Sequence, residues 1–145
     1  MSSAPPITPI DLSVFAEIID NARADNNSGV VATIGRDGPD VGLKGSLLVW
    51  DTDQVAWWER TLRETYAAIQ NDPRVCVLVR NPTRDRRTIR LYGKATIVDD
   101  PELRERIWDR VVQLEKDTDK EKKGAAVLVR VDRVRAGLDT IQQRV

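Results

Sequence analysis

The spacing of hydrophobic residues changes along this chain, and the changes divide it into predicted helices and strands. After Asp11, the apolar residues recur on one face of a helix, at Phe15, Ile18, Ile19 and Ala22. Aspartate is a preferred N-cap residue, so Asp11 is suited to begin this helix. The turn-forming run Asp-Asn-Asn-Ser-Gly at 25–29 ends it. We therefore predict a first helix between these two signals.

Three short β-prone segments linked by turns follow this helix. The segments are 30–34, 40–50 and 55–59, and the turns are 36–39 and 51–54. This series predicts an antiparallel meander. Trp57 and Trp58 are neighbours in the third segment, so their side chains face opposite sides. We expect one of them in the interior and the other against a helix, a partner chain or a ligand.

The second half of the chain predicts two more helices and three more strands. Residues 62–71 form a short helix that stops before Pro73, and a helix that opens at 99–102 has an apolar face. That face consists of Leu103, Ile107, Val111 and Leu114. The strands are 75–79, 86–99 and 125–134, and the charge run 117–123 is predicted as a solvated loop. The pattern predicts a mainly β protein, a six-stranded antiparallel split barrel with flanking helices.

Length and charge limit the classes of protein to consider. The 145 residues suit one domain, which we place at 10–139, after a flexible arm at 1–9 and before a tail at 140–145. Lys and Arg total 23 and Asp and Glu also total 23, so no net charge draws the chain to nucleic acid or an anionic membrane. No apolar run approaches the roughly 20 residues of a membrane span. The start, MSSAPPITPI, has no basic flank or apolar h-region, and we expect a cytoplasmic protein.

The scarcity of histidine and cysteine limits the catalytic chemistry that the side chains can supply. The chain has no histidine and one cysteine, Cys76, which lies in an apolar strand and is interpreted as a small buried side chain. Histidine-based nucleophilic catalysis is therefore excluded, and no metal site is predicted. If the protein is an enzyme, a bound organic cofactor is expected to supply the chemistry.

The segment Trp58–Thr65 is the richest in candidate chemistry. It leads from a strand end into a helix start, where free N–H groups and the helix dipole favour an anion such as phosphate. Arg60 and Arg63 add charged donors, and Thr61 and Thr65 add hydroxyls. The alternative is an ordinary helix start whose arginines pair with Glu59 and Glu64.

A second candidate lies in the neighbouring strand, at Lys44, Gly45, Ser46 and Leu47. Glycine in a strand permits close approach of a flat ligand, and the alternative is a half-buried strand with no ligand. A third group is the arginine cluster at 80, 84, 86, 87 and 90. It lacks interleaved aromatic residues, which argues against nucleic acid. Arg87 and Thr88 are candidates to donate to a ligand held by a partner subunit.

Several strings of the chain together resemble the pyridoxamine 5'-phosphate oxidase-like FMN-binding split-barrel superfamily. They are GVVATIGRDGP at 29–39, SLL at 46–48, NDPRV at 71–75 and LYGKA at 91–95. The resemblance covers about residues 10–135 and implies a homodimer with two flavin sites across the interface. It implies that Lys44–Leu47 run beside the isoalloxazine ring and that Trp58–Thr65 take the ribityl chain and phosphate. Residues matching Arg87 and Thr88 of the other subunit would complete each site.

The chain also departs from the pattern of this family. Many members have Ser-Arg-Lys at the phosphate, where this chain has Arg63-Glu64-Thr65, and the C-terminal Trp and Arg motifs of the true oxidases are missing. We therefore do not predict pyridoxal phosphate synthesis.

The resemblance leaves three functions open. The first is an FMN-dependent oxidoreductase that acts on a small-molecule redox substrate or electron donor. The other two are an F420-dependent reductase and a flavin-binding or degenerate dimer without turnover. In the first, Arg60, Arg63 and Thr65 would hold the phosphate, and Lys44 would stabilise the reduced flavin from the polar edge of the ring. The sequence assigns no catalytic residue.

Overall fold

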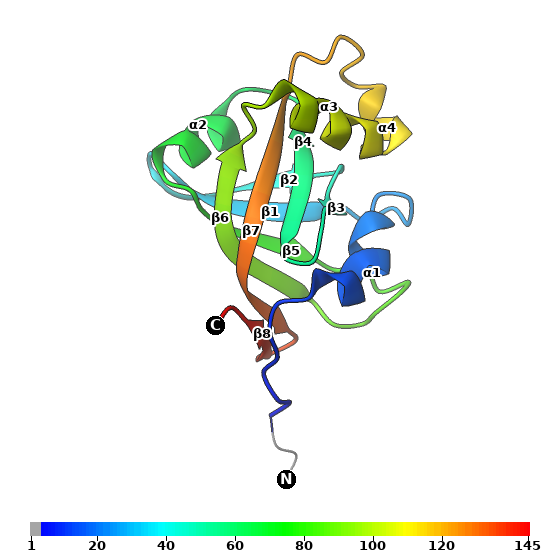
Figure 1. The fold of residues 1–145 in the computed structure, drawn as a ribbon, viewed down its shortest axis with the longest axis vertical. Helices are drawn as coiled ribbons and strands as arrows, with labels where there is room; N and C mark the ends of the chain where they lie inside the picture. The colour runs from blue at the N-terminus through cyan, green and yellow to red at the C-terminus, as the bar shows by residue number, and fades with distance from the viewer. Residues whose placement is uncertain (1–3) are drawn as a thin grey trace.

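The strands form one antiparallel sheet that curls into a half-open barrel with helices at its ends and side (Figure 1). The computed structural model describes residues 4–145. The strands are β1 (Gly29–Gly35), β2 (Gly38–Lys44), β3 (Leu48–Val49), β4 (Gln54–Glu59), β5 (Arg74–Val79), β6 (Ile89–Ile97), β7 (Ala125–Ala136) and β8 (Asp139–Gln143). Their order is β2-β1-β5-β6-β7-β4-β3, and β8 pairs with β7. The predicted split-barrel class is confirmed.

Residues 4–145 form eight strands instead of the six that were predicted. The predicted strand 40–50 is divided, because β2 ends at Lys44 and β3 begins only at Leu48. The predicted tail at 140–145 is also corrected, since most of it belongs to β8. Gln142 of β8 is buried, and its side chain exchanges two 2.9 Å hydrogen bonds with the backbone of Asp11.

Part of the predicted N-terminal arm is docked against β8. Thr8 forms a parallel bridge with Gln142, and its backbone N–H donates to the Ile141 carbonyl at 3.0 Å. Residues 1–3 of the predicted arm lie outside the described residues. The arm and the tail are thus joined to each other across the base of the barrel.

The helices follow the predicted signals, with one correction. They are the 3-10 turn η1 (Leu12–Phe15), α1 (Ala16–Asp20), α2 (Glu64–Asn71), α3 (Pro101–Arg110) and α4 (Gln113–Lys116). Asp11 caps η1 as predicted, and Asp100 caps α3. The predicted apolar face of the last helix is wrong at Leu114, because α3 ends at Arg110 and Leu114 lies in α4, 52% exposed.

Trp57 and Trp58 divide the hydrophobic residues into two clusters, as strand alternation requires. The Trp57 side chain is fully buried inside the barrel, with residues such as Phe15, Val77 and Leu91. Trp58 faces outward and packs edge-on against Trp108 of α3, with ring centroids 4.7 Å apart. The neighbour of the outward tryptophan is therefore a helix of the same chain.

The predicted solvated loop at 117–123 is irregular and mostly exposed, and Asp119 ties it to Trp58. Asp119 accepts hydrogen bonds from the Trp58 indole at 2.8 Å and from the N–H groups of Gly124 and Lys123. Burial alone would raise the pKa of the Asp119 carboxyl, but these bonds outweigh it, and the pKa is lowered. The carboxylate thus holds the segment against the end of β4.

Replacing Asp119→Ala should lower the free energy of unfolding by about 1–3 kcal/mol, because the buried indole N–H loses its acceptor. The lowered pKa makes this contribution complete above the ordinary aspartate value near pH 4, and it is lost as the pH falls below that. Urea unfolding at pH 7 and pH 3 measures both effects. Glu121→Ala, at an exposed position of the same segment, is the control, and an equal loss in both variants would contradict this account.

Candidate functional site

The predicted phosphate segment is a short exposed connection between β4 and α2. Arg60, Thr61 and Arg63 are exposed, and the charged groups of both arginines have no carboxylate within 4.0 Å in residues 4–145. Arg63 occupies the N-cap position of α2, and its side chain makes no capping hydrogen bond. The N–H groups at the start of α2 are therefore available to an anion. The alternative in which Glu59 and Glu64 pair with these arginines does not hold in this structure.

Glu59 pairs instead with Lys44, in a buried cluster at the end of β4. The Lys44 ammonium lies 2.9 and 3.1 Å from the two carboxylate oxygens of Glu59. The indole of Trp57 donates to the same carboxylate at 2.9 Å. Lys44 Nζ also lies 3.4 Å from the hydroxyl of Thr65 in the first turn of α2. Three predicted site residues from β2, β4 and α2 thus meet, and the side chains of Lys44 and Glu59 are only 12% and 4% exposed.

The three residues after Lys44 have separate roles. The hydroxyl of Ser46 accepts a hydrogen bond from the Trp58 N–H at 2.9 Å and donates to the Trp58 carbonyl at 3.3 Å, so it joins this segment to β4. Leu47 is buried in the barrel interior. Gly45 is covered by α4, since a Cβ at this position would lie 1.6 Å from Glu115 Oε1. Sequence analysis missed Glu115, because nothing local in the charged run around it marks a contact with residue 45.

Two hollows lie on either side of the β4–α2 connection. The first, which we call the Lys44 cavity, has a volume of about 160 Å³ and is lined by Lys44, Gly45, Ser46, Trp58, Glu59 and Arg60, and by others including Glu115. The second, the α2 groove, has a volume of about 670 Å³ and is lined by Ile34, Gly35, Arg36, Leu62, Arg63 and Glu64, and by Ala67, Ala68 and Asn71 of α2. The structure therefore brings most of the predicted site together but places Arg60 and Arg63 in different hollows.

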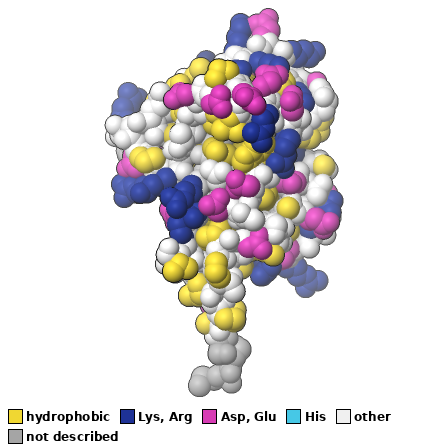
Figure 2. Space-filling view, viewed as in Figure 1, with side chains coloured by type: hydrophobic (Ala, Val, Ile, Leu, Met, Phe, Trp, Pro, Cys, Tyr) yellow, Lys and Arg dark blue, Asp and Glu magenta, His cyan; other side chains and the backbone are white. Residues whose placement is uncertain are grey.

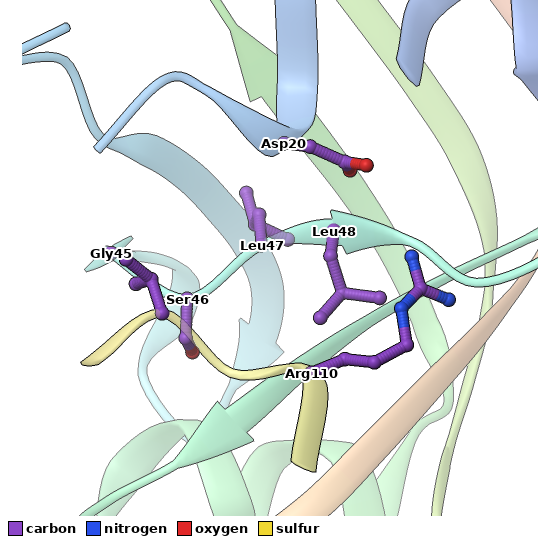
Figure 3. Close-up of a pocket in the computed structure, with 7 residues that line it drawn as sticks. Asp20, Gly45, Ser46, Leu47, Leu48 and Arg110 are labelled. Atoms are coloured by element: carbon purple, nitrogen blue, oxygen red, sulfur yellow. The ribbon is translucent and has the colours of Figure 1, made fainter. Parts of the chain in front are cut away.

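A third hollow of about 240 Å³ adjoins the Lys44 cavity at Gly45 and Ser46 (Figure 3). Asp20 and Arg110 approach it from elements on opposite sides of β3. Burial raises the pKa of the Asp20 carboxyl, although the Val49 N–H donates to it at 2.7 Å and Arg110 is near. Arg110 donates to the Val49 carbonyl at 2.8 Å. Both side chains thus complete the backbone hydrogen bonding of an edge strand.

Arg87 and Thr88 lie away from the other predicted residues within one chain. They precede β6 where it pairs with the end of β7, whereas Glu59 pairs with Ala125 at the start of β7. Arg87 is paired with Asp85 at 2.9 Å, and its hydrogen bond lowers the pKa of that carboxyl. One chain therefore does not unite these two residues with the Lys44 cavity.

The face seen in Figure 2 mixes both signs of charge with apolar side chains. Within residues 4–145 no three acidic or cysteine side chains are grouped to hold a metal ion. The same residues include no helix long and apolar enough to cross a membrane.

Comparison with known proteins identifies the family. The family model for pyridoxamine 5'-phosphate oxidase matches residues 15–136, and the chain belongs to this family. A comparison with curated proteins gives no match.

Solved structures share the fold. HupZ of Group A Streptococcus superposes with a TM-score of 0.69 at 19% identity, over 89% of this chain and 95% of that chain. An FMN-binding protein from Syntrophomonas wolfei subsp. wolfei has a TM-score of 0.62 at 15% identity, over 86% of each chain. An F420 reductase has a TM-score of 0.60 at 22% identity, over 86% of this chain and 95% of that chain. Because the sequence identities are this low, the three structures support a shared fold and not a shared function.

Substitution of two glycines, Gly45 beside the Lys44 cavity and Gly93 in β6, should affect stability differently. Gly45→Ala should leave the thermal midpoint nearly unchanged, because its methyl group displaces only the flexible end of Glu115. Gly93→Ala should lower the midpoint strongly, because its Cβ would lie 2.1 Å from the Arg130 backbone oxygen. Thermal unfolding of both variants measures this contrast. Comparable midpoints would show that the packing around Gly45 or Gly93 differs from that described.

Proposed function

We propose that this protein binds FMN between the two subunits of a homodimer and acts as a flavin-dependent oxidoreductase. Family membership supports the proposal. Two structures with the same fold are, by name, an FMN-binding protein and an F420 reductase. A bound flavin supplies hydride or electron transfer, and the protein supplies binding, orientation and electrostatics.

The observation that carries the proposal is the set of positive groups around the β4–α2 connection, with Lys44 and Arg60 in one hollow and Arg63 in the other. Lys44, Arg60 and Arg63 all flank it, and the open N-terminus of α2 adds the positive end of a helix dipole. A phosphate monoester suits this donor set, because it accepts charge-assisted hydrogen bonds from guanidinium groups and backbone N–H groups.

The hollow beside Gly45 fits the flavin ring only in part. The Lys44 cavity holds about 160 Å³, which is below the range of roughly 300–1,000 Å³ for pockets that enclose a ligand. The phosphate end therefore has its donors within one chain, whereas the ring needs a further wall. A second copy of the chain is the source of that wall in this proposal, with Arg87 and Thr88 as its candidate donors.

The outer face of the sheet supports the homodimer. Strand pairing aligns Leu43, Val30 and Leu78 in one row across β2, β1 and β5, and Val41, Ala32 and Cys76 in the next. Leu43 and Val41 are 74% and 68% exposed. A continuous apolar face with exposed large side chains is typical of an interface, and the same face of a second copy is chemically complementary to it.

A second candidate cofactor is F420, favoured by the α2 groove. This groove is larger than the Lys44 cavity, and Arg36 and Arg63 both line it. A deazaflavin with a long acidic tail suits such a groove better than the short phosphate end of FMN. A non-catalytic flavin-binding dimer is the third possibility, and redox assays separate it from the two enzymes.

The visible spectrum of the freshly purified protein, followed by titration with FMN and F420, tests the proposal. We expect a yellow protein with one flavin per subunit. Arg63→Ala should weaken FMN about tenfold or more, because a charge-assisted bond to phosphate is lost. Arg86→Ala, at an exposed position in the loop before β6, is the control. Equal affinities of both variants would place the phosphate elsewhere, and absence of binding to either cofactor would refute the proposed function.

Val41→Arg should convert the dimer to a monomer and weaken FMN binding, because it buries an unpaired charge in the proposed interface. Sedimentation at micromolar concentration measures the mass. Leu138→Arg is the matched control, since Leu138 is 90% exposed in the turn between β7 and β8. A monomeric mass for the unaltered protein would contradict the homodimer.

A further inference from the structure

Glu59 is a buried carboxylate that the proposed function does not use. Its side chain is 4% exposed, and the residue lies at the end of β4, directly before the predicted phosphate segment. Its carboxylate accepts hydrogen bonds from Lys44 and from the Trp57 indole, and Lys44 also forms an ion pair with its second oxygen. Of the two other carboxylates beside the Lys44 cavity and the start of α2, Glu64 is exposed and Glu115 is half-buried beside Arg23 at 4.0 Å.

The Lys44 ammonium stands between this carboxylate and the start of α2. It contacts both oxygens of Glu59 on one side and approaches the Thr65 hydroxyl on the other. A phosphate at the start of α2 would therefore be close to a negative charge as well as to the cation. Because Glu59 is nearly inaccessible to water, its charge is weakly screened there.

We propose that Glu59 determines the selectivity of the site by offsetting the charge of Lys44 and so weakening binding of the phosphate group of the ligand. This inference rests on the proposed function and specifies which part of a flavin contributes most to its binding affinity. A dianionic phosphate gains less from Lys44 than from an unpaired lysine, whereas the uncharged oxidised ring and ribityl chain respond much less to the charge of this pair. The site thereby discriminates only modestly between FMN and riboflavin.

The ratio of the riboflavin Kd to the FMN Kd tests this role directly. Glu59→Gln keeps the shape and a hydrogen-bond acceptor for Trp57 and Lys44 but removes the charge. The ratio should rise about tenfold or more in this variant, since removal of a like charge at this separation strengthens binding of the charged phosphate far more than binding of the uncharged ring. Quenching of flavin fluorescence during titration of the full-length protein gives both constants.

Glu64→Gln is the matched control, because it removes the same charge from an exposed position in the first turn of α2. Screening by water should keep its effect on the ratio well below that of Glu59→Gln. Lys44→Met is a second variant that tests the same pair from its other side. It should lower the ratio, because Glu59 then acts without compensation.

The outcomes separate this inference from the proposed function. If Glu59→Gln changes both flavin affinities alike, or neither, or if Lys44→Met raises the ratio, Glu59 has only a structural role and the inference is wrong while flavin binding stands. If the unaltered protein binds no flavin, the proposed function fails, and the thermal shift caused by inorganic phosphate then decides the inference. A larger shift for Glu59→Gln than for the unaltered protein supports it, and equal shifts overturn it.

Discussion

The alternation of side chains over the last three residues of β4 is the constraint on which the site depends. Trp57 and Glu59 face the interior side, and Trp58 faces α3. Their partners on β7 are Val127, Ala125 and Ala126, which are small enough to leave room for two tryptophans. A slip of one residue in this pairing would turn Glu59 outward and drive Trp58 into the barrel. The register of β4 on β7 therefore sets both the core and the position of the buried charge.

The buried pair of Lys44 and Glu59 follows from this register, and its energetics set it apart from the surface ion pairs. Taking two charges from water costs several kcal/mol each, and their attraction offsets that cost only when the hydrogen bonds are complete. Glu59 meets this condition through Lys44 and the Trp57 indole. A pair of apolar residues of similar volume could serve stability equally well. In the proposed function, the pair also sets the charge that a ligand would meet at the start of α2.

Most of the fold could be predicted because its signals are local. The turn residues between β1 and β4, the adjacent tryptophans and the aspartate caps of η1 and α3 act within a few positions of the chain. Strand β8 has no such signal, because Asp139–Gln143 is polar. Its burial depends on a side chain, Gln142, that bonds the backbone of Asp11. The division of the strand 40–50 likewise depends on a contact between Ser46 and β4 that no periodicity shows.

The residues of the buried cluster around Lys44 were identified one by one from the sequence, but their contacts with one another were not predicted. Lys44, Glu59 and Thr65 were each identified from a strand or a helix start, yet the buried ion pair among them depends on the curl of the sheet. Glu115 was missed because its contact with Gly45 joins segments far apart in the sequence. Tertiary contacts of this kind leave no pattern in a single sequence.

The positions that depart from the family pattern illustrate the difference between a motif and a site. The resemblance implies a lysine at the position of Thr65, so along the sequence the predicted phosphate site lacks that cation. In space, the ammonium of Lys44 reaches Thr65 from β2 at 3.4 Å, so a positive charge stands beside the first turn of α2 after all. Lys44 is paired with Glu59, which offsets its charge. A lysine on α2 itself would not have to form this pair. The charge available to a ligand is therefore set by the β2–β4 pair, and substitutions at residue 65 alone do not measure it.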